Sequence, residues 1–157
     1  VVQSKVGYIK TAQAAITNLS IGVLNGIFYN AATTLKPTWA NWYNQPITPA
    51  NSEDLTAFVL DNPFQLFVCA TDGAVTQAGY GKTYGVTVTA AGSEISGQSS
   101  STLTTGTVSN TANQWRLLRV AEDPSNKDMT AAYTSVVVAH NLNQFLQNTG
   151  TAGITWQ

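Results

Sequence analysis

Short apolar stretches rich in Val, Ile, Thr and aromatic residues recur along the chain, and Gly, Asn, Asp and Pro separate them. This pattern is typical of β-strands joined by tight turns. Turn signals include Asp72 before Gly73, and Pro63, which disfavours helical geometry at the residue before it. The clearest predicted strands span residues 21–29, 64–70, 84–90, 114–120 and 134–141.

Helical signals are weak. Ser52 is a plausible N-cap for a helix over 51–60, but this segment runs into a strand-like apolar stretch, so we expect at most one or two short helical turns. Residues 90–113 are rich in Ser, Thr and Gly and offer little apolar surface to offset the entropy of ordering. We expect a long exposed loop or ribbon there, in which 101–109 alternates only enough for a short edge strand.

The segment 114–120 carries apolar residues on both faces. Strict alternation predicts that Arg119 shares a face with Trp115 and opposes Arg116. A strand of this kind belongs between two layers or at an interface. The predicted fold class is therefore all-β, a single domain over residues 1–157, built as a jelly-roll-like β-barrel or β-sandwich with long loops.

The charge of the chain narrows the classes of partner. It has 157 residues, with 7 Lys and Arg against 8 Asp and Glu, so its formal net charge is -1. No basic field is present to attract nucleic acid. Charged residues make up 10% of the chain, against roughly 25% in ordinary soluble domains. A polar, nearly uncharged surface is tolerated best when a partner covers it, which favours an assembly protein that recognises its partner by shape.

Cysteine usage and hydropathy exclude other classes. Cys69 is the single cysteine, so no intramolecular disulfide and no cysteine zinc site can form, and we expect it to be a small buried apolar residue. No apolar run approaches the ~20 residues that span a bilayer, and no basic-then-apolar leader is present, so we expect a soluble protein without a membrane partner. The chain begins at Val1 without a methionine, and we expect an upstream N-terminal segment to be missing from it.

The motifs that suggest chemistry have plainer structural interpretations. Gly81, Lys82 and Thr83 match the end of a phosphate-binding loop, but Thr76 stands where the first glycine of that loop is needed, and a strand follows instead of a helix. We interpret this stretch as a glycine-rich β-turn. The acidic residues at 53–61 and 122–128 lack the ligand spacing of a calcium loop.

His140 is the only histidine, and no Gly-x-Ser-x-Gly nucleophile motif accompanies it. One histidine also cannot form a histidine-rich metal site. We therefore expect no catalytic residue, no cofactor and no metal, and we expect His140 to hydrogen-bond to nearby backbone or across an interface. A hydrolase that uses His140 is kept as a rival hypothesis.

Three aromatic residues, Trp39, Trp42 and Tyr43, lie in the proline-flanked segment 36–49, where no regular core element is evident. Amphipathic rings on a rigid loop serve both protein interfaces and sugar-binding surfaces. The equally weighted alternative is that these rings fold back as a lid over one end of a barrel.

The succession of four segments resembles a known family. "FQLFVCATDG", "SGQSSSTLTTGT", "QWRLLRVAEDPSN" and "YTSVVVAHNLNQF" follow one another within residues 55–145. In this order and spacing the chain resembles the capsid decoration, or cement, proteins of tailed bacteriophages. The resemblance implies a β-rich virion structural protein, assembled in the bacterial cytoplasm, that binds the outside of the head and clamps neighbouring subunits of the major capsid protein, commonly as a homotrimer.

On this interpretation the candidate contact residues are three aromatic residues and, as a second set on an exposed strand face, three polar ones: Trp39, Trp42, Tyr43, Arg116, Arg119 and His140. Two other hypotheses remain open. One is a carbohydrate-binding β-sandwich module that stacks sugar rings on the 39–43 segment. The other is a different phage structural protein, such as a tail-tube subunit.

Overall fold

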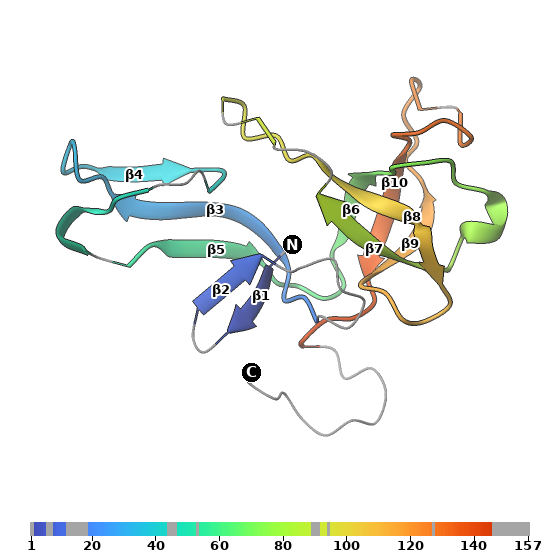
Figure 1. The fold of residues 1–157 in the computed structure, drawn as a ribbon, viewed down its shortest axis with the longest axis horizontal. Helices are drawn as coiled ribbons and strands as arrows, with labels where there is room; N and C mark the ends of the chain where they lie inside the picture. Colours follow the sequence, from blue (N-terminus) through green and yellow to red (C-terminus); the bar gives the residue numbers. More distant parts are fainter. Residues whose placement is uncertain are drawn as a thin grey trace.

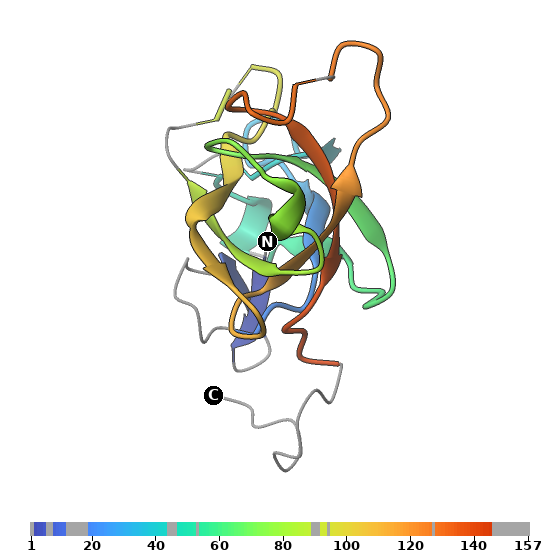
Figure 2. The ribbon, with the colours of Figure 1, turned by 90° about the vertical axis from the view of Figure 1, so that its right-hand side faces the viewer.

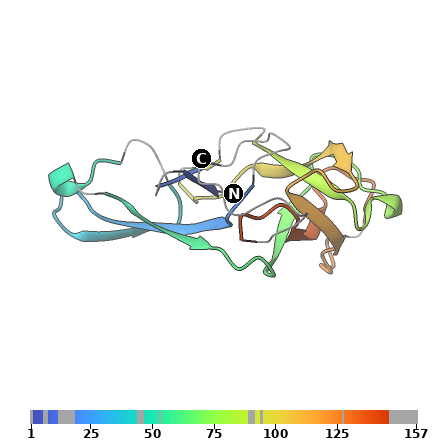
Figure 3. The same ribbon diagram turned by 90° about the horizontal axis from the view of Figure 1, so that it is seen from below.

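A computed structural model describes residues 2–5, 8–11, 19–43, 47–52, 54–88, 92–93, 95–126 and 128–145. Within these residues the chain forms ten strands in three sheets and two short 3-10 helices, so the all-β prediction is confirmed. Eight of the strands form a flat arm and a small barrel that lie end to end (Figures 1 and 3), and the other two pair as a separate hairpin. None of the helices in the described part is long and apolar enough to cross a membrane.

The arm is a three-stranded antiparallel sheet with the order β4-β3-β5, in which β3 (Val23–Asn30) is the central strand. The sequence of residues 51–60 was compatible with either a helix or a strand, and the structure has the strand β5 (Thr56–Leu60) there. A single 3-10 turn, η1 (Ala50–Ser52), precedes it. The strand β4 (Pro37–Ala40) was not predicted, because its four residues have no apolar pattern of their own. The hydrogen bonds that it shares with β3 stabilise it as a strand.

The barrel contains β6 (Leu66–Ala70), β7 (Thr83–Val88), β8 (Ser101–Ser109), β9 (Trp115–Val120) and β10 (Ser135–His140) in the order β6-β10-β9-β7-β8. The sheet curls until its two outer strands meet, as the view along the barrel shows (Figure 2). At this seam Thr71 forms a parallel bridge with Leu103, and the backbone N–H of Asp72 donates to the carbonyl of Leu103 over 2.9 Å. The short helix η2 (Gln77–Gly79) lies at the end of the barrel far from the arm (Figure 1).

Within the segment 90–113, which was expected to be mainly a loop or ribbon, the possible edge strand at 101–109 is present as β8, a strand of nine residues. Its one buried large apolar residue, Leu103, is 0% exposed and belongs to the core beneath the seam. The threonines of β8 also find partners, since Thr104 Oγ1 donates to Thr87 Oγ1 on β7 over 2.5 Å. Pairing and one core contact therefore order a strand that has little apolar surface.

The barrel core contains the buried residues Val75, Tyr84, Leu103, Trp115, Leu117, Val136 and Val138. The prediction that Arg119 shares a face with Trp115 is wrong. Arg119 pairs with Val137 and Leu117 pairs with Val138, so Leu118 is an extra residue in a β-bulge and the alternation restarts after it. Arg119 is exposed as a result, while Trp115 and Leu117 point inward.

Two further elements lie near the root of the arm, which is the end of the arm next to the barrel (Figure 1). The strands β1 (Val2–Lys5) and β2 (Tyr8–Thr11) pair as a separate antiparallel hairpin. The segment before β3 is bound to the end of the barrel, because the backbone N–H of Ser20 donates to the carbonyl of Leu142 and the N–H of Gln144 donates to the carbonyl of Ser20. These bonds attach the root of the arm to the residues that follow β10.

Candidate interaction surface

One face of the arm carries aromatic side chains that meet over a glycine. Gly26, in the centre of β3, lies opposite Phe58 on β5, while Trp39 on β4 lies opposite Phe28. A Cβ atom at Gly26 would lie 2.4 Å from the indole of Trp39, so only glycine leaves room for this ring. Trp39 therefore reaches across β3 and contacts Phe58, with ring centroids 5.0 Å apart.

We define the apolar face of the arm as Phe28, Trp39, Phe58 and Leu60, and its four side chains are between 40% and 46% exposed. The opposite face is the better covered one, since Ile27 is 2% exposed. The indole N–H of Trp39 donates to Asn41 Oδ1 over 2.7 Å, so this polar group is already satisfied. The strands β3, β4 and β5 contain no charged residue. Exposed apolar clusters of this kind are typical of interaction surfaces, so this face is a candidate for one.

The outer edge of β5 is the second feature of the arm. Among the described residues β5 pairs only with β3, so its other edge presents unpaired backbone N–H and C=O groups. Natural proteins protect such edges with charges, prolines or bulges. Residues 56–60 contain none of these protective residues, whereas the opposite edge strand, β4, begins with Pro37. The edge of β5 is therefore able to accept an extended segment of a partner.

Trp42 and Tyr43 occupy different environments although they are adjacent. Trp42 is half-buried because its indole lies over Gly97, where a Cβ would come within 2.2 Å of the ring. Gly97 belongs to the β7–β8 connection, which reaches from the barrel toward the arm (Figure 1). Trp42 therefore connects the arm to the barrel through its contact with Gly97. Tyr43 is 46% exposed and lies next to the end of β4.

His140 was expected on an exposed strand face, and this expectation is wrong, because His140 is 6% exposed. It points inward from β10 with Val136 and Val138. Its Nδ1 lies 3.2 Å from Ser20 Oγ, and its ring contacts those of Trp115 and Phe67. Burial lowers the pKa of His140 to about 4. Its ring is enclosed, and none of the described residues that contact it is a carboxylate. His140 therefore helps to hold the segment before β3 against the barrel through Ser20.

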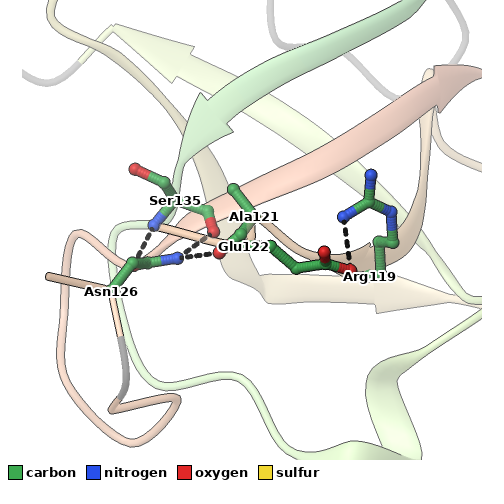
Figure 4. A network of polar contacts seen from close by, with 5 residues as sticks. All are labelled: Arg119, Ala121, Glu122, Asn126 and Ser135. Atoms are coloured by element: carbon green, nitrogen blue, oxygen red, sulfur yellow. Dashed lines mark hydrogen bonds and ion pairs between the residues drawn. The ribbon is translucent and has the colours of Figure 1, made fainter. Parts of the chain in front are cut away.

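The two arginines lie on the outside of β9 with different partners. Arg116 donates from Nη1 to the carbonyl of Gly81 over 2.6 Å and from Nη2 to Asn141 Oδ1 over 2.8 Å. The one ion pair of Arg119 among the described residues is with Glu122, at 3.3 Å (Figure 4). Both side chains are more than half exposed. An exposed pair of this kind contributes about 0–1 kcal/mol. Neither arginine lies on the arm, so the six predicted contact residues do not form one patch.

The sequence analysis missed Phe28, Phe58 and Leu60. The signal was present as the alternation of "TAFVL" and as a glycine between apolar residues in "LNGIFY", but only the pairing of β4 and β5 with the same strand brings these rings together. Within the described ranges no three His, Cys, Asp or Glu residues are grouped to hold a metal ion. Cys69 is half-buried against the barrel core.

Comparison of the chain with protein-family models, with curated proteins and with solved structures gave no match in any of the three.

Proposed function

We propose that this protein is a cement protein of a phage head, a virion structural protein that binds the outer surface of the major capsid protein lattice through its arm. The observation that carries the proposal is the apolar face of the arm, where Trp39 and Phe58 are in ring contact and remain 46% exposed. The succession of segments that resembles the decoration proteins supports the same function.

The chemistry of the arm favours a protein surface as its partner. The absence of charge on β3, β4 and β5 gives phosphate or a basic peptide nothing to pair with. Rings such as Trp39 supply the large, rigid contact area that dominates protein interfaces. Covering the remaining exposed area of one such ring contributes about 2 kcal/mol, at roughly 25 cal/mol per Å².

A clamp needs a rigid attachment between its two parts, and two separate contacts connect the arm to the barrel. On one side the segment at Ser20 is hydrogen-bonded to Leu142 and Gln144, and on the other side Trp42 packs on Gly97. Contacts of modest strength, repeated by the symmetry of a shell, can stabilise the whole lattice without any one of them being strong. The proposal includes a homotrimer, which sedimentation equilibrium of the isolated protein tests.

The deciding experiment is cosedimentation of the protein with purified heads that lack it, comparing expanded with unexpanded heads. We expect binding to expanded heads, and we expect Trp39→Ser and Phe58→Ser each to weaken it at least about tenfold, because both rings lie in the proposed contact. Tyr133→Ser is the matched control, since Tyr133 is an exposed aromatic residue on the barrel. Failure to bind either form of head overturns the proposal, as does an equal loss of binding in the control.

The second candidate function is carbohydrate binding, which the half-exposed indole of Trp39 favours because sugar rings stack on such surfaces. A sugar site also needs polar groups that fix the hydroxyls, and on this side of the arm Thr56, which lies opposite Phe28 and is exposed, offers one. Saturable binding of the isolated protein to a glycan array, lost in Trp39→Ser, would favour this function over the capsid.

A further inference from the structure

A small cavity is lined by residues of η2 and of the strands next to it. The helix η2 lies at the end of the barrel away from the arm (Figure 1). The volume of the cavity is about 160 Å³. The cavity is lined by the core residues Val75 and Tyr84 and by the small side chains of Ala74, Ala78 and Val108. A site for an extended small molecule is usually about 300 Å³ or more, so this one suits a group the size of one amino-acid side chain.

The wall of the cavity is held in place before any ligand arrives. Tyr84 is 4% exposed, and its hydroxyl donates to the carbonyl of Gly79 over 3.2 Å. A Cβ at Gly79 would lie 2.3 Å from that hydroxyl, so glycine is needed for the phenol to reach the turn. Val75 is anchored in addition, because its N–H donates to the carbonyl of Met129. A preformed apolar wall lowers the entropy cost of binding.

The charge at the cavity is positive. Lys82 lines it, and none of the other described lining residues carries a carboxylate. Within the described part of the chain, Lys82 forms no ion pair. A second positive charge lies close to Lys82, because the guanidinium of Arg116 donates to the carbonyl of Gly81, the residue before Lys82. The other partner of this guanidinium, Asn141, is neutral. Thr105, which also lines the cavity, donates its N–H and its hydroxyl to Asp72 Oδ1, so this carboxylate already has partners.

We propose that this cavity binds a carboxylate carried by a short branched aliphatic group, with the aliphatic group against Val75 and Tyr84 and the carboxylate at Lys82. Thr76, also in the lining, adds a hydroxyl that caps no backbone group of η2. A free short-chain acid and the C-terminal Val or Leu of a polypeptide share this chemistry. The site is separate from the proposed capsid contact, because none of its lining residues belongs to the arm.

The test follows backbone amide NMR signals of the full chain during titration with isovalerate. We expect saturable shifts at residues 74–84, and at least about tenfold weaker binding for isovaleramide, the uncharged isostere, because a charge-assisted contact is lost. Lys82→Met and Lys82→Gln should weaken isovalerate binding to the same degree. Lys36→Met, which removes an exposed lysine before β4, should leave it unchanged. Spectral dispersion shows whether each variant is folded.

Three results overturn the proposal: no saturable shift, equal affinity for the acid and its amide, or equal loss in Lys36→Met and Lys82→Met. A second titration separates the two sources of the carboxylate. Short peptides ending in a free C-terminal leucine are compared with the same peptides amidated. Tighter binding of the free-ended peptide than of isovalerate supports a polypeptide end, and binding of isovalerate alone supports a small free acid. Neither titration depends on binding to heads, so the two proposals fail independently.

Discussion

The imidazole of His140 lies against the indole of Trp115, with ring centroids 4.1 Å apart and ring planes inclined by 32°. Ser20 Oγ has a single hydrogen, and when it donates that hydrogen to the carbonyl of Leu142 it accepts a bond from His140 Nδ1. The other ring nitrogen, Nε2, is buried, and the part of the chain that the structure describes offers it no hydrogen-bond partner. The neutral imidazole therefore fits this site, because a second proton on the ring would find no acceptor among those residues.

The stability of the protein should fall as the pH drops through the range set by His140. Burial lowers the pKa of the folded-state imidazole from 6.5 to about 4. Between these two pH values His140 is protonated in the unfolded chain but stays neutral in the folded chain. The free energy of unfolding therefore decreases as the pH falls. The loss amounts to about 1.4 kcal/mol per pH unit. Urea unfolding at a series of pH values measures it.

His140→Asn is the control for this dependence, because the amide can keep a bond to Ser20 but does not titrate. The variant should be less stable at neutral pH, since it loses the contact with Trp115, and its stability should change little between pH 6.5 and 5. Hydrogen bonds from Ser125 lower the pKa of the exposed carboxyl of Asp123, so this acid remains ionised over that range. A pH slope equal to that of the unchanged protein would assign the effect to another group.

The contact between Trp42 and Gly97 should respond to a single methyl group. Gly97 has a φ of +68°, and a Cβ there would lie 2.2 Å from the indole, so Gly97→Ala adds a steric clash to an unfavourable backbone conformation. Gly81→Ala is a matched control, because Gly81 has a φ of +75° with no atom within 4 Å of its Cβ position. The control should cost about 1–2 kcal/mol in unfolding free energy, and Gly97→Ala should cost more.

Combining Gly97→Ala with Trp42→Ala separates these two effects. When the indole is absent, only the backbone term remains, and the added cost of Gly97→Ala should fall to that of Gly81→Ala. Hydrogen exchange of residues 95–100 should increase in Gly97→Ala, because the β7–β8 connection loses its contact with the arm. Unchanged protection there would mean that Trp42 does not tie this connection to the arm.

The sequence identified the strands that carry their own apolar pattern. β3, β6, β7, β9 and β10 were predicted because Val, Leu and aromatic residues dominate them. β4 was not predicted, and β8 was expected only as a possible short edge strand, because pairing with β3 and β7 is what orders these two strands. Long-range pairing of this kind leaves little trace in a local pattern, which is why β-propensity depends so strongly on context.

For the candidate surface, too, the sequence predicted single residues but not the contacts that depend on long-range pairing. Trp39 was predicted as a contact residue from its proline-flanked segment, but its partner Phe58 comes from a strand that meets it only across β3. The inward direction of His140 follows the parity of Val136 and Val138, and the continuous apolar run 136–139 conceals that parity in the sequence. The outward direction of Arg119 depends on the bulge at Leu118, which no local signal marks.

The half-buried thiol of Cys69 should react slowly. Burial raises the pKa of this thiol above its ordinary value of 9.0, so less thiolate is present at a given pH than in a free cysteine. We expect alkylation by iodoacetamide near pH 8 to be at least about tenfold slower than for a cysteine peptide, and to reach the peptide rate in urea. Intact mass against time measures both rates, and a native rate equal to that of the peptide would contradict the burial.

Asn126 closes the loop between β9 and β10, as Figure 4 shows. Its Nδ2 donates to the carbonyls of Ala121 and Ser135 over 3.0 and 2.7 Å, and its Oδ1 accepts from the N–H of Ser135 over 2.9 Å. Asn126→Asp keeps the shape and the acceptor but removes both donors, so a carboxylate would face two carbonyl oxygens. We expect a loss of about 2–3 kcal/mol in unfolding free energy at neutral pH.

Acid should restore part of the stability lost in Asn126→Asp, because a protonated carboxyl group can donate to one of the two carbonyls. The facing carbonyl oxygens raise the pKa of this aspartate in the folded state, so the stabilising proton is bound at low pH and lost as the pH rises through that value. The difference from the unchanged protein in urea unfolding should therefore shrink as the pH falls. Arg119→Ala removes only the exposed contact with Glu122, and it should change stability by no more than about 0.5 kcal/mol at any pH. A difference for Asn126→Asp that stays constant with pH would mean that the two carbonyls do not depend on the amide of Asn126.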